Sequence, residues 1–153
     1  MIMMEISTRD FGPIRVEADA LYAFPEGIYG FEEEKQFALV LRTYGDASLL
    51  YLQSTVHPAP CFLVFDPGDL CPGYRPTLSA EDLRQCGAEA ADELVFLTIA
   101  TVRDKIEDMT INLKSPIVMN PKKKTARQVI LQDPEYLIRY RPFDPEGKEG
   151  ASC

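Results

Sequence analysis

The residue types best suited to catalysis are sparse in this sequence. The chain has one histidine, His57, which lies in the run Gln-Ser-Thr-Val-His-Pro at residues 53–58. A serine or cysteine nucleophile would need this histidine as its base, with a carboxylate behind it. No nucleophile-elbow pattern stands nearby, and Cys61 falls in an apolar run, where a thiol is usually an inert core residue. We interpret His57 as a loop residue before a proline, with a small hydrolase or isomerase that uses His57 as the alternative.

Metal and cofactor motifs are also missing from the sequence. The four cysteines, at positions 61, 71, 86 and 153, form no CxxC pair and have no histidine at metal-ligand spacing, so we expect free thiols and no metal site. The run Gly-Ile-Tyr-Gly at residues 27–30 does not match GxGxxG, and no GxxxxGK run occurs. We therefore predict no cofactor and no catalytic residue.

The charge balance is acidic and uneven. The formal net charge is −8, and phosphate contacts need a concentrated basic surface, so we expect no direct nucleic-acid binding. The lysines at residues 122–124 have no interleaved aromatic residues and are interpreted as a solvated turn. Residues 1–100 carry 6 Lys and Arg against 16 Asp and Glu, a net of −10, whereas residues 101–153 carry 10 against 8, a net of +2. A basic partner would be attracted to the N-terminal two thirds of the chain.

Length and composition describe one ordinary globular domain. The chain has 153 residues, of which 46% are hydrophobic, enough to bury roughly 68–70% of the unfolded surface in a single core. No apolar stretch reaches the ~18–20 residues of a membrane span, and the opening residues lack the features of a signal peptide. We expect a cytoplasmic protein that does not bind membranes and is monomeric on its own.

Short apolar runs separated by Gly, Pro, Asn and Asp dominate the chain, with a local period of two. Residues 4–7 and 14–17 alternate around a turn and predict an N-terminal hairpin. Continuous apolar runs predict strands covered on both faces at 37–41, 49–52 and 61–65. Further strands are expected at 21–24, 94–102, 109–113, 116–120 and 128–131. The pattern predicts a mainly β fold, a small single-domain antiparallel β-barrel or sandwich.

Helical signals are few. In residues 79–86, Ser79 can cap the free N–H groups, Asp82 completes a capping box, and Gly87 supplies a left-handed end. A second short helix is considered near residues 88–93, so we expect one or two short helices in all. The domain is expected to span residues 1–140, followed by a flexible C-terminal tail at 141–153 with an exposed terminal cysteine.

The segment Phe-Pro-Glu-Gly-Ile-Tyr-Gly-Phe at residues 24–31 stands out from the rest of the chain. Two glycines and a proline fix a tight, irregular turn, and four large apolar side chains crowd into the same eight residues. These side chains must either plug the barrel or stay exposed as a contact patch. From the residues alone, the two alternatives remain open.

This segment resembles the most characteristic motif of the flagellar assembly factor FliW family, Phe-Pro-x-Gly-Ile-x-Gly-Phe. The resemblance continues, in the family's order and spacing, through residues 52–54, 62–67, 74–76, 110–120 and 128–131, and covers the chain from about Met4 to Tyr140. It implies a small β-barrel and a non-catalytic regulator of flagellum assembly.

The resemblance also implies two protein partners. Members of the family bind CsrA, a dimeric translational repressor, at a site distinct from its RNA surface, and they bind flagellin as the alternative partner. When flagellin is exported, the free factor captures the repressor and translation of flagellin mRNA resumes. The composition fits this partner switch, because an acidic body beside a basic RNA-binding protein lowers the potential that attracts RNA.

Within that resemblance we expect residues 24–31 to form the contact surface. Ile28, Tyr29 and Phe31 are predicted to be anchors and Glu26 a polar partner, because aromatic anchors in a fixed loop are typical of binding hot spots. Phe24 is expected in the core.

Three further residues are expected contacts near the other end of the chain. Asn112 and Asn120 flank a strand pair, and either contacts a partner or closes a turn through its own backbone. Lys114 is expected to be exposed, where it could pair with an acidic residue of a partner.

Overall fold

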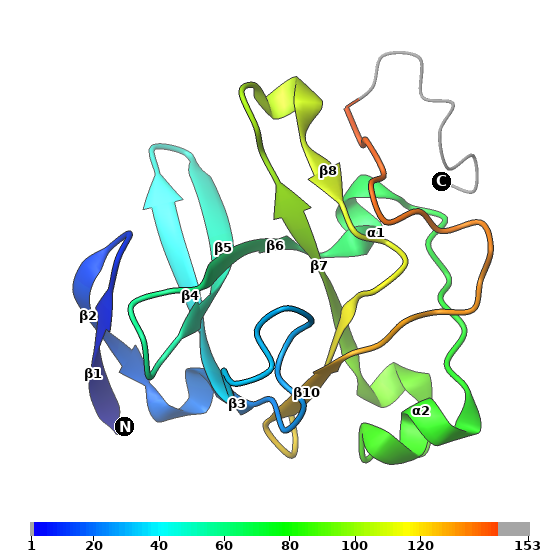
Figure 1. Cartoon of the computed structure of the whole chain (residues 1–153), viewed down its shortest axis with the longest axis horizontal. Coiled ribbons are helices and arrows are strands. Elements are labelled where there is room, and N and C mark those ends of the chain that lie inside the picture. The colour runs from blue at the N-terminus through cyan, green and yellow to red at the C-terminus, as the bar shows by residue number, and fades with distance from the viewer. Residues whose placement is uncertain (1, 144–153) are drawn as a thin grey trace.

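Strands are the main regular elements of the molecule (Figure 1). The structure, a computed structural model, describes residues 2–143. Its strands are β1 (Met3–Thr8), β2 (Gly12–Glu17), β3 (Leu21–Ala23), β4 (Gln36–Tyr44), β5 (Ala47–Ser54), β6 (Cys61–Phe65), β7 (Val95–Thr101), β8 (Thr110–Ile111), β9 (Ile117–Asn120) and β10 (Thr125–Gln128). The short helices are α1 (Pro67–Leu70) and α2 (Ala80–Gln85), with 3-10 turns η1 (Ala18–Ala20), η2 (Ala91–Glu93) and η3 (Ile106–Asp108). The prediction of a mainly β fold is confirmed.

The larger sheet of the described residues closes on itself. Strands β3, β4, β5 and β6 pair antiparallel in chain order, β6 pairs with β7, and β7, β9 and β10 continue the ring. Closure comes from a parallel contact between β10 and β3, through Thr125 and Ala23. Figure 1 shows the resulting ring of strands. The fold is therefore a closed barrel, antiparallel except at this seam, and β8 extends from β7 outside the ring.

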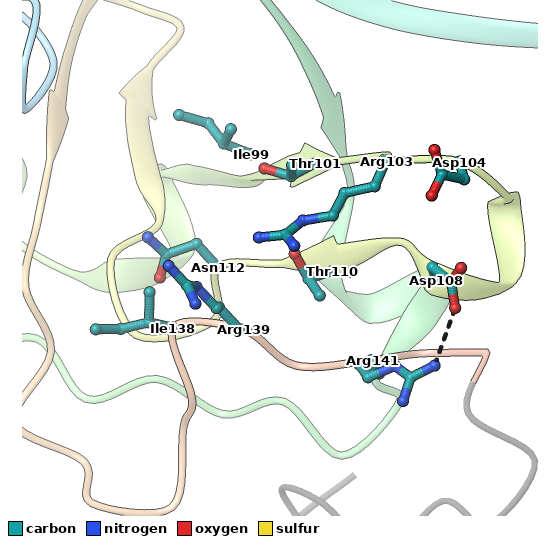
Figure 2. Close-up of a pocket in the computed structure, with 10 residues that line it drawn as sticks. All are labelled: Ile99, Thr101, Arg103, Asp104, Asp108, Thr110, Asn112, Ile138, Arg139 and Arg141. Carbon is teal, nitrogen blue, oxygen red and sulfur yellow. Dashed lines mark hydrogen bonds and ion pairs between the residues drawn. The ribbon is translucent and has the colours of Figure 1, made fainter.

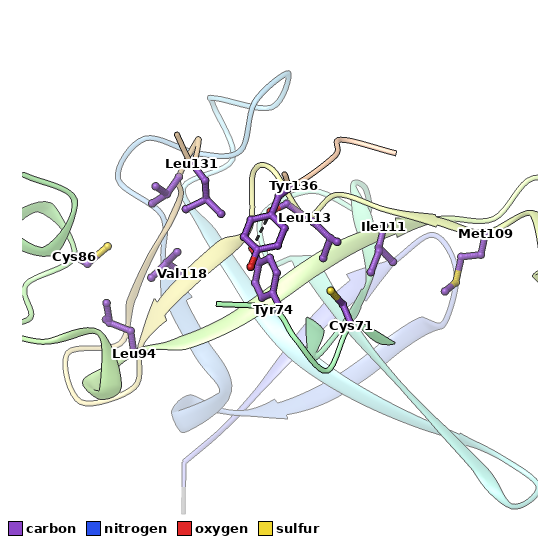
Figure 3. Close-up of a cluster of buried hydrophobic side chains, with 11 residues drawn as sticks. Cys71, Tyr74, Cys86, Leu94, Met109, Ile111, Leu113, Val118, Leu131 and Tyr136 are labelled. Carbon is purple, nitrogen blue, oxygen red and sulfur yellow. Dashed lines mark hydrogen bonds between the residues drawn. The ribbon is translucent and has the colours of Figure 1, made fainter. Parts of the chain in front are cut away.

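Strand β9 separates two cores because successive side chains of a strand point to opposite faces. Ile117 and Met119 face a cluster inside the barrel, whereas Val118 faces a second cluster outside it. Figure 3 shows this outer cluster, in which the rings of Tyr74 and Tyr136 lie 4.5 Å apart. All four residues of β9 are buried, which explains why its sequence shows no polar alternation. Burial of an apolar side chain such as Ile117, Val118 or Met119 contributes about 1.5–3 kcal/mol.

The predicted N-terminal hairpin is confirmed and packs on the barrel from outside. β1 pairs antiparallel with β2. Ile6 and Val16 of the hairpin are buried against Ala38 and Val40 of β4. Since Phe37 of the same strand faces the barrel interior, the first half of β4 is covered on both faces, as its continuous apolar run predicts.

The last predicted strand is displaced. The apolar run at 128–131 predicts a strand there, but β10 covers Thr125–Gln128. The turn after β9 is tight, with Lys124 at a φ of 57°, so pairing resumes three residues earlier than expected. Val129 and Leu131 still donate backbone hydrogen bonds to the carbonyls of Pro116 and Lys114, at 3.0 and 2.8 Å.

The helix at residues 80–85 forms for the reasons that its sequence indicates. The Ser79 hydroxyl accepts from the backbone N–H of Asp82, the Asp82 carboxylate accepts from the N–H of Ser79, and Gly87 follows at a φ of 71°. The second helix considered at 88–93 is only the 3-10 turn η2. Helix α1 was not expected, although Asp66 caps it and Pro67 stands in its first turn, a combination that favours a helix start.

The cysteines follow the predictions in part. Cys61 and Cys86 are free thiols. Cys61 is half-buried and belongs to no core cluster of the described residues, although burial still raises its pKa to about 11. Cys71 is disulfide-bonded, so the expectation of free thiols is wrong at that position. The predicted exposure of Cys153, and the predicted tail beyond residue 143, lie outside the described residues. Within residues 2–143, no helix is long and apolar enough to cross a membrane.

Candidate partner-binding site

Residues 24–31, here called the plug loop, form the first part of the connection from β3 to β4 and lie within the ring of strands in Figure 1. Phe24 and Ile28 are buried in the inner core, and the Phe24 ring meets the ring of Phe37 edge to face at 4.9 Å. Gly27 makes the turn between them at a φ of 66°, a conformation that disfavours any side chain. One half of the segment therefore plugs the barrel.

Hydrogen bonds fix the plug loop on both sides. Within it, the N–H of Gly27 donates to the carbonyl of Phe24 at 2.9 Å, and the N–H of Phe31 donates to the carbonyl of Ile28 at 2.6 Å. Across to β10, the N–H of Tyr29 donates to Oε1 of Gln128 at 2.9 Å. These bonds hold the loop in one conformation, which lowers the entropy cost of presenting it to a partner.

The other half of the plug loop is exposed. Tyr29 is 57% exposed and Phe31 42%, and the Phe31 ring rests edge-on against Phe62 at 5.3 Å. Glu26 is also at the surface. Ile28, predicted to be a partner anchor, is only 2% exposed, so it fixes the loop instead of contacting a partner.

Acidic side chains surround the exposed aromatic rings. Residues 24–36 contain four glutamates and one lysine, a net of −3. Glu32 accepts from the N–H of Gly30 at 2.9 Å, and this bond holds the pKa of Glu32 below its usual value. Glu26, Tyr29 and Glu32 also border a depression of about 180 Å³ against β10, where Arg127 is the one basic residue in the described lining. The surface combines negative charge with aromatic area, which suits a basic protein partner.

The remaining predicted contact residues lie elsewhere and make internal bonds. Asn112 Oδ1 accepts from the N–H of Ser115 at 2.9 Å, and Asn120 Oδ1 accepts from the N–H of Lys123 at 3.1 Å. Both asparagines therefore close turns, and Asn120, at 4% exposure, is too buried to contact a partner. Lys114, expected to be exposed, is half-buried, with its Nζ 3.5 Å from the carbonyl of Asp133. Only Glu26, Tyr29 and Phe31 of the predicted set share one surface.

His57 is paired with a carboxylate that its sequence neighbourhood did not indicate. Its Nδ1 lies 2.9 Å from Oε2 of Glu34, and the hydroxyl of Ser54 donates to Oε1 of the same carboxylate. In a catalytic triad the imidazole stands between the hydroxyl and the carboxylate. Here the carboxylate stands between them, so Ser54 has no imidazole base. Glu34 and His57 are 23 residues apart, and no spacing rule links them.

The Glu34 carboxylate is expected to make stability depend on acidic pH. The hydrogen bond from the Ser54 hydroxyl holds the pKa of Glu34 below its usual value. Burial raises this pKa and the contact with His57 lowers it, and the net effect is a lowered pKa. A lowered folded-state pKa stabilises the fold above the unfolded pKa of about 4.3, and this contribution is lost as pH falls through the folded value. Glu34→Gln should therefore destabilise the protein at neutral pH by more than it does at about pH 3. Denaturant unfolding at several pH values measures this, with the exposed neighbour Glu33→Gln as control. An E34Q effect that stays constant down to pH 3 would contradict the assignment.

Comparison with known proteins decides the family. A family model described as FliW protein matches residues 5–142. The chain belongs to the FliW family of flagellar assembly factors. The prediction made from the motif at 24–31 is confirmed, and the match covers nearly all of the described barrel.

Individual FliW relatives match over similar lengths. The flagellar assembly factor FliW of Heliobacterium modesticaldum is 38% identical over 92% of this chain and 91% of its own length. That of Geotalea uraniireducens is 32% identical over 95% of this chain and 88% of its own length. A crystal structure of the flagellar assembly factor FliW superposes with a TM-score of 0.81 at 34% identity, over 92% of this chain and 97% of that chain. The barrel described above is therefore the FliW fold.

Proposed function

We propose that this chain is a non-catalytic regulator of flagellum assembly that binds the translational repressor CsrA and antagonises its repression of flagellin mRNA. Flagellin is the alternative partner, so the amount of free regulator follows flagellin export. The proposal places the protein in the cytoplasm, as a monomer when it is alone. Membership of the FliW family supports the role in flagellum assembly, and the resemblance described above suggests the partners.

One observation carries the choice of contact surface. Tyr29 and Phe31 are exposed on a loop that buried neighbours and hydrogen bonds hold rigid. Large aromatic side chains that a monomer leaves exposed in a fixed conformation are typical binding anchors. The glutamates around them attract a basic partner, and a negative body beside an RNA-binding surface weakens the attraction of RNA without occupying its site. The negative charge of the bound regulator would therefore antagonise RNA binding by CsrA without competing for the RNA site.

The experiment is a calorimetric titration of the protein with purified CsrA from the same organism, repeated in the presence of flagellin. We expect saturable binding that flagellin abolishes and that weakens as salt concentration rises. If neither protein binds at micromolar concentration, the proposed function is wrong.

A tyrosine substitution tests the surface. Tyr29→Ala should weaken CsrA binding by about tenfold or more, because it removes an exposed aromatic anchor from the centre of the acidic loop. The matched control is Tyr44→Ala, which removes a tyrosine of similar exposure, 51% against 57%, from the end of β4. Equal binding by wild type and Tyr29→Ala in the same titration would refute the plug loop as the contact surface.

A further inference from the structure

A second concave surface lies on the outside of the barrel. It is a hollow of about 710 Å³ between the β7–β8 hairpin and residues 138–141 (Figure 2). Figure 1 shows this hairpin projecting beyond the ring of strands, away from the plug loop inside the ring. We call the hollow the arginine cavity, after Arg103, Arg139 and Arg141 in its lining.

The walls of the arginine cavity are held together by backbone hydrogen bonds. Ile111 and Tyr140 exchange N–H to carbonyl bonds of 2.9 and 3.0 Å, which tie residues 138–141 to β8. The N–H of Asn112 donates to the carbonyl of Ile99 at 3.0 Å, which ties the chain after β8 to β7. The cavity therefore exists before any ligand arrives, and binding does not have to order its walls.

The arginines are only partly neutralised. Arg141 lies 3.3 Å from a carboxylate oxygen of Asp108. Within residues 2–143, neither Arg103 nor Arg139 forms an ion pair. In Figure 2, Arg103 points back along the hairpin toward Thr110, whereas Asp104 lies at the hairpin's outer end. Two guanidinium groups thus face the hollow with no carboxylate partner among the described residues, on a chain whose net charge is −8.

The rest of the lining indicates a peptide ligand. Ile99 and Ile138 border the hollow, and Ile138 is 61% exposed. None of the described residues that line it is aromatic, so they offer no stacking platform for nucleic-acid bases. The guanidinium fork matches a carboxylate in two parallel hydrogen bonds. A peptide with carboxylates next to aliphatic side chains could pair with the arginines and pack against the isoleucines of the lining.

We propose that the arginine cavity binds an acidic segment of a partner protein, with carboxylates on Arg103 and Arg139 and an aliphatic side chain on Ile138. Its charge preference is opposite to that of the plug loop, so the two surfaces suit different partner segments. This inference does not rest on the proposed function, because the cavity is defined by its own residues.

The experiment is an amide-resolved NMR titration with a capped peptide of alternating glutamate and leucine. We expect saturable shifts at Thr110, Asn112 and Ile138, and none with the peptide that has glutamine in place of glutamate. The double variant R103Q/R139Q should bind about tenfold more weakly, because it loses the charge-assisted hydrogen bonds. The control R15Q/R84Q changes the net charge equally at two exposed arginines outside the cavity and should bind as wild type does.

Three results would overturn the proposal. The first is no binding by the glutamate peptide, or shifts confined to other residues. The second is equal loss of affinity in R103Q/R139Q and in the control, which would indicate a long-range charge effect. The third is equally tight binding of inorganic phosphate or of a single-stranded RNA oligomer at the same residues, which would make the cavity a general anion site. A thermal unfolding scan of each variant shows that a loss of binding does not come from unfolding.

Discussion

Substitution of Gly27 by alanine is expected to destabilise the protein by about 3 kcal/mol or more, a large share of a typical total. Two effects add at this position. The φ of 66° disfavours any residue with a Cβ. A Cβ there would also lie 2.5 Å from Cα of Glu32 and 2.7 Å from the carbonyl oxygen of Phe31. Both contacts are with backbone, so no side chain can rotate away and the plug loop itself must move.

Gly30 is the matched control for this prediction. It lies in the same loop with a φ of 88°, but a Cβ there would meet no atom within 4 Å. Gly30→Ala should therefore cost only about 1–2 kcal/mol, the conformational part alone. Denaturant unfolding measures both variants. Equal costs for the two substitutions would mean that the close approach at Gly27 is not a constraint on the fold.

The strands themselves were largely predictable because their cause is local. Period-two patterns and turn residues mark the hairpin of β1 and β2, and Ser79 with Asp82 marks the start of α2. The position of β10 was not predictable from its apolar run. Val129 and Leu131 are buried and Ile130 is exposed beyond the end of β10, so the burial of the run does not mark where pairing begins. Pairing instead follows the tight turn that ends at Lys124.

The candidate sites were less predictable because they depend on tertiary arrangement. Residues 24–31 contain four large apolar side chains, and the expectation that Phe24 lies in the core is confirmed. Nothing in the sequence says that Ile28 also turns inward while Tyr29 and Phe31 remain outside. The family motif identified residues 24–31 as the candidate contact segment, but it did not predict which of its side chains are buried. The arginine cavity had an even weaker signal, a small positive balance after residue 100. Its walls are separate in sequence and are brought together by tertiary contacts, such as the pairing of Tyr140 with Ile111 and of Arg141 with Asp108.

The two phenylalanines at the ends of the plug loop are expected to differ in what they lose when each is changed to alanine: Phe24→Ala mainly stability, Phe31→Ala mainly partner binding. Phe24 is fully buried against Phe37, so Phe24→Ala removes core contacts and leaves a cavity, at a cost of about 3–5 kcal/mol. Phe31 is 42% exposed and has an edge contact with Phe62, so Phe31→Ala should cost about 1 kcal/mol. Unfolding in denaturant gives both values.

The loss of CsrA affinity should be larger for a substitution at Phe31 than for one at Phe24, the reverse of the order for the loss of stability. Phe31→Ala should weaken CsrA binding by about tenfold or more while the protein stays folded, because the lost ring lies on the proposed contact surface. Phe24→Leu, which keeps most of the buried volume and costs less than Phe24→Ala, should bind nearly as wild type does. It allows the comparison even if Phe24→Ala fails to fold. If Phe31→Ala bound normally and Phe24→Leu did not, the partner would recognise the conformation of the loop and not its exposed aromatic face. The combination of a stability effect at Phe24 with a binding effect at Phe31 is what a loop with one buried and one exposed half requires.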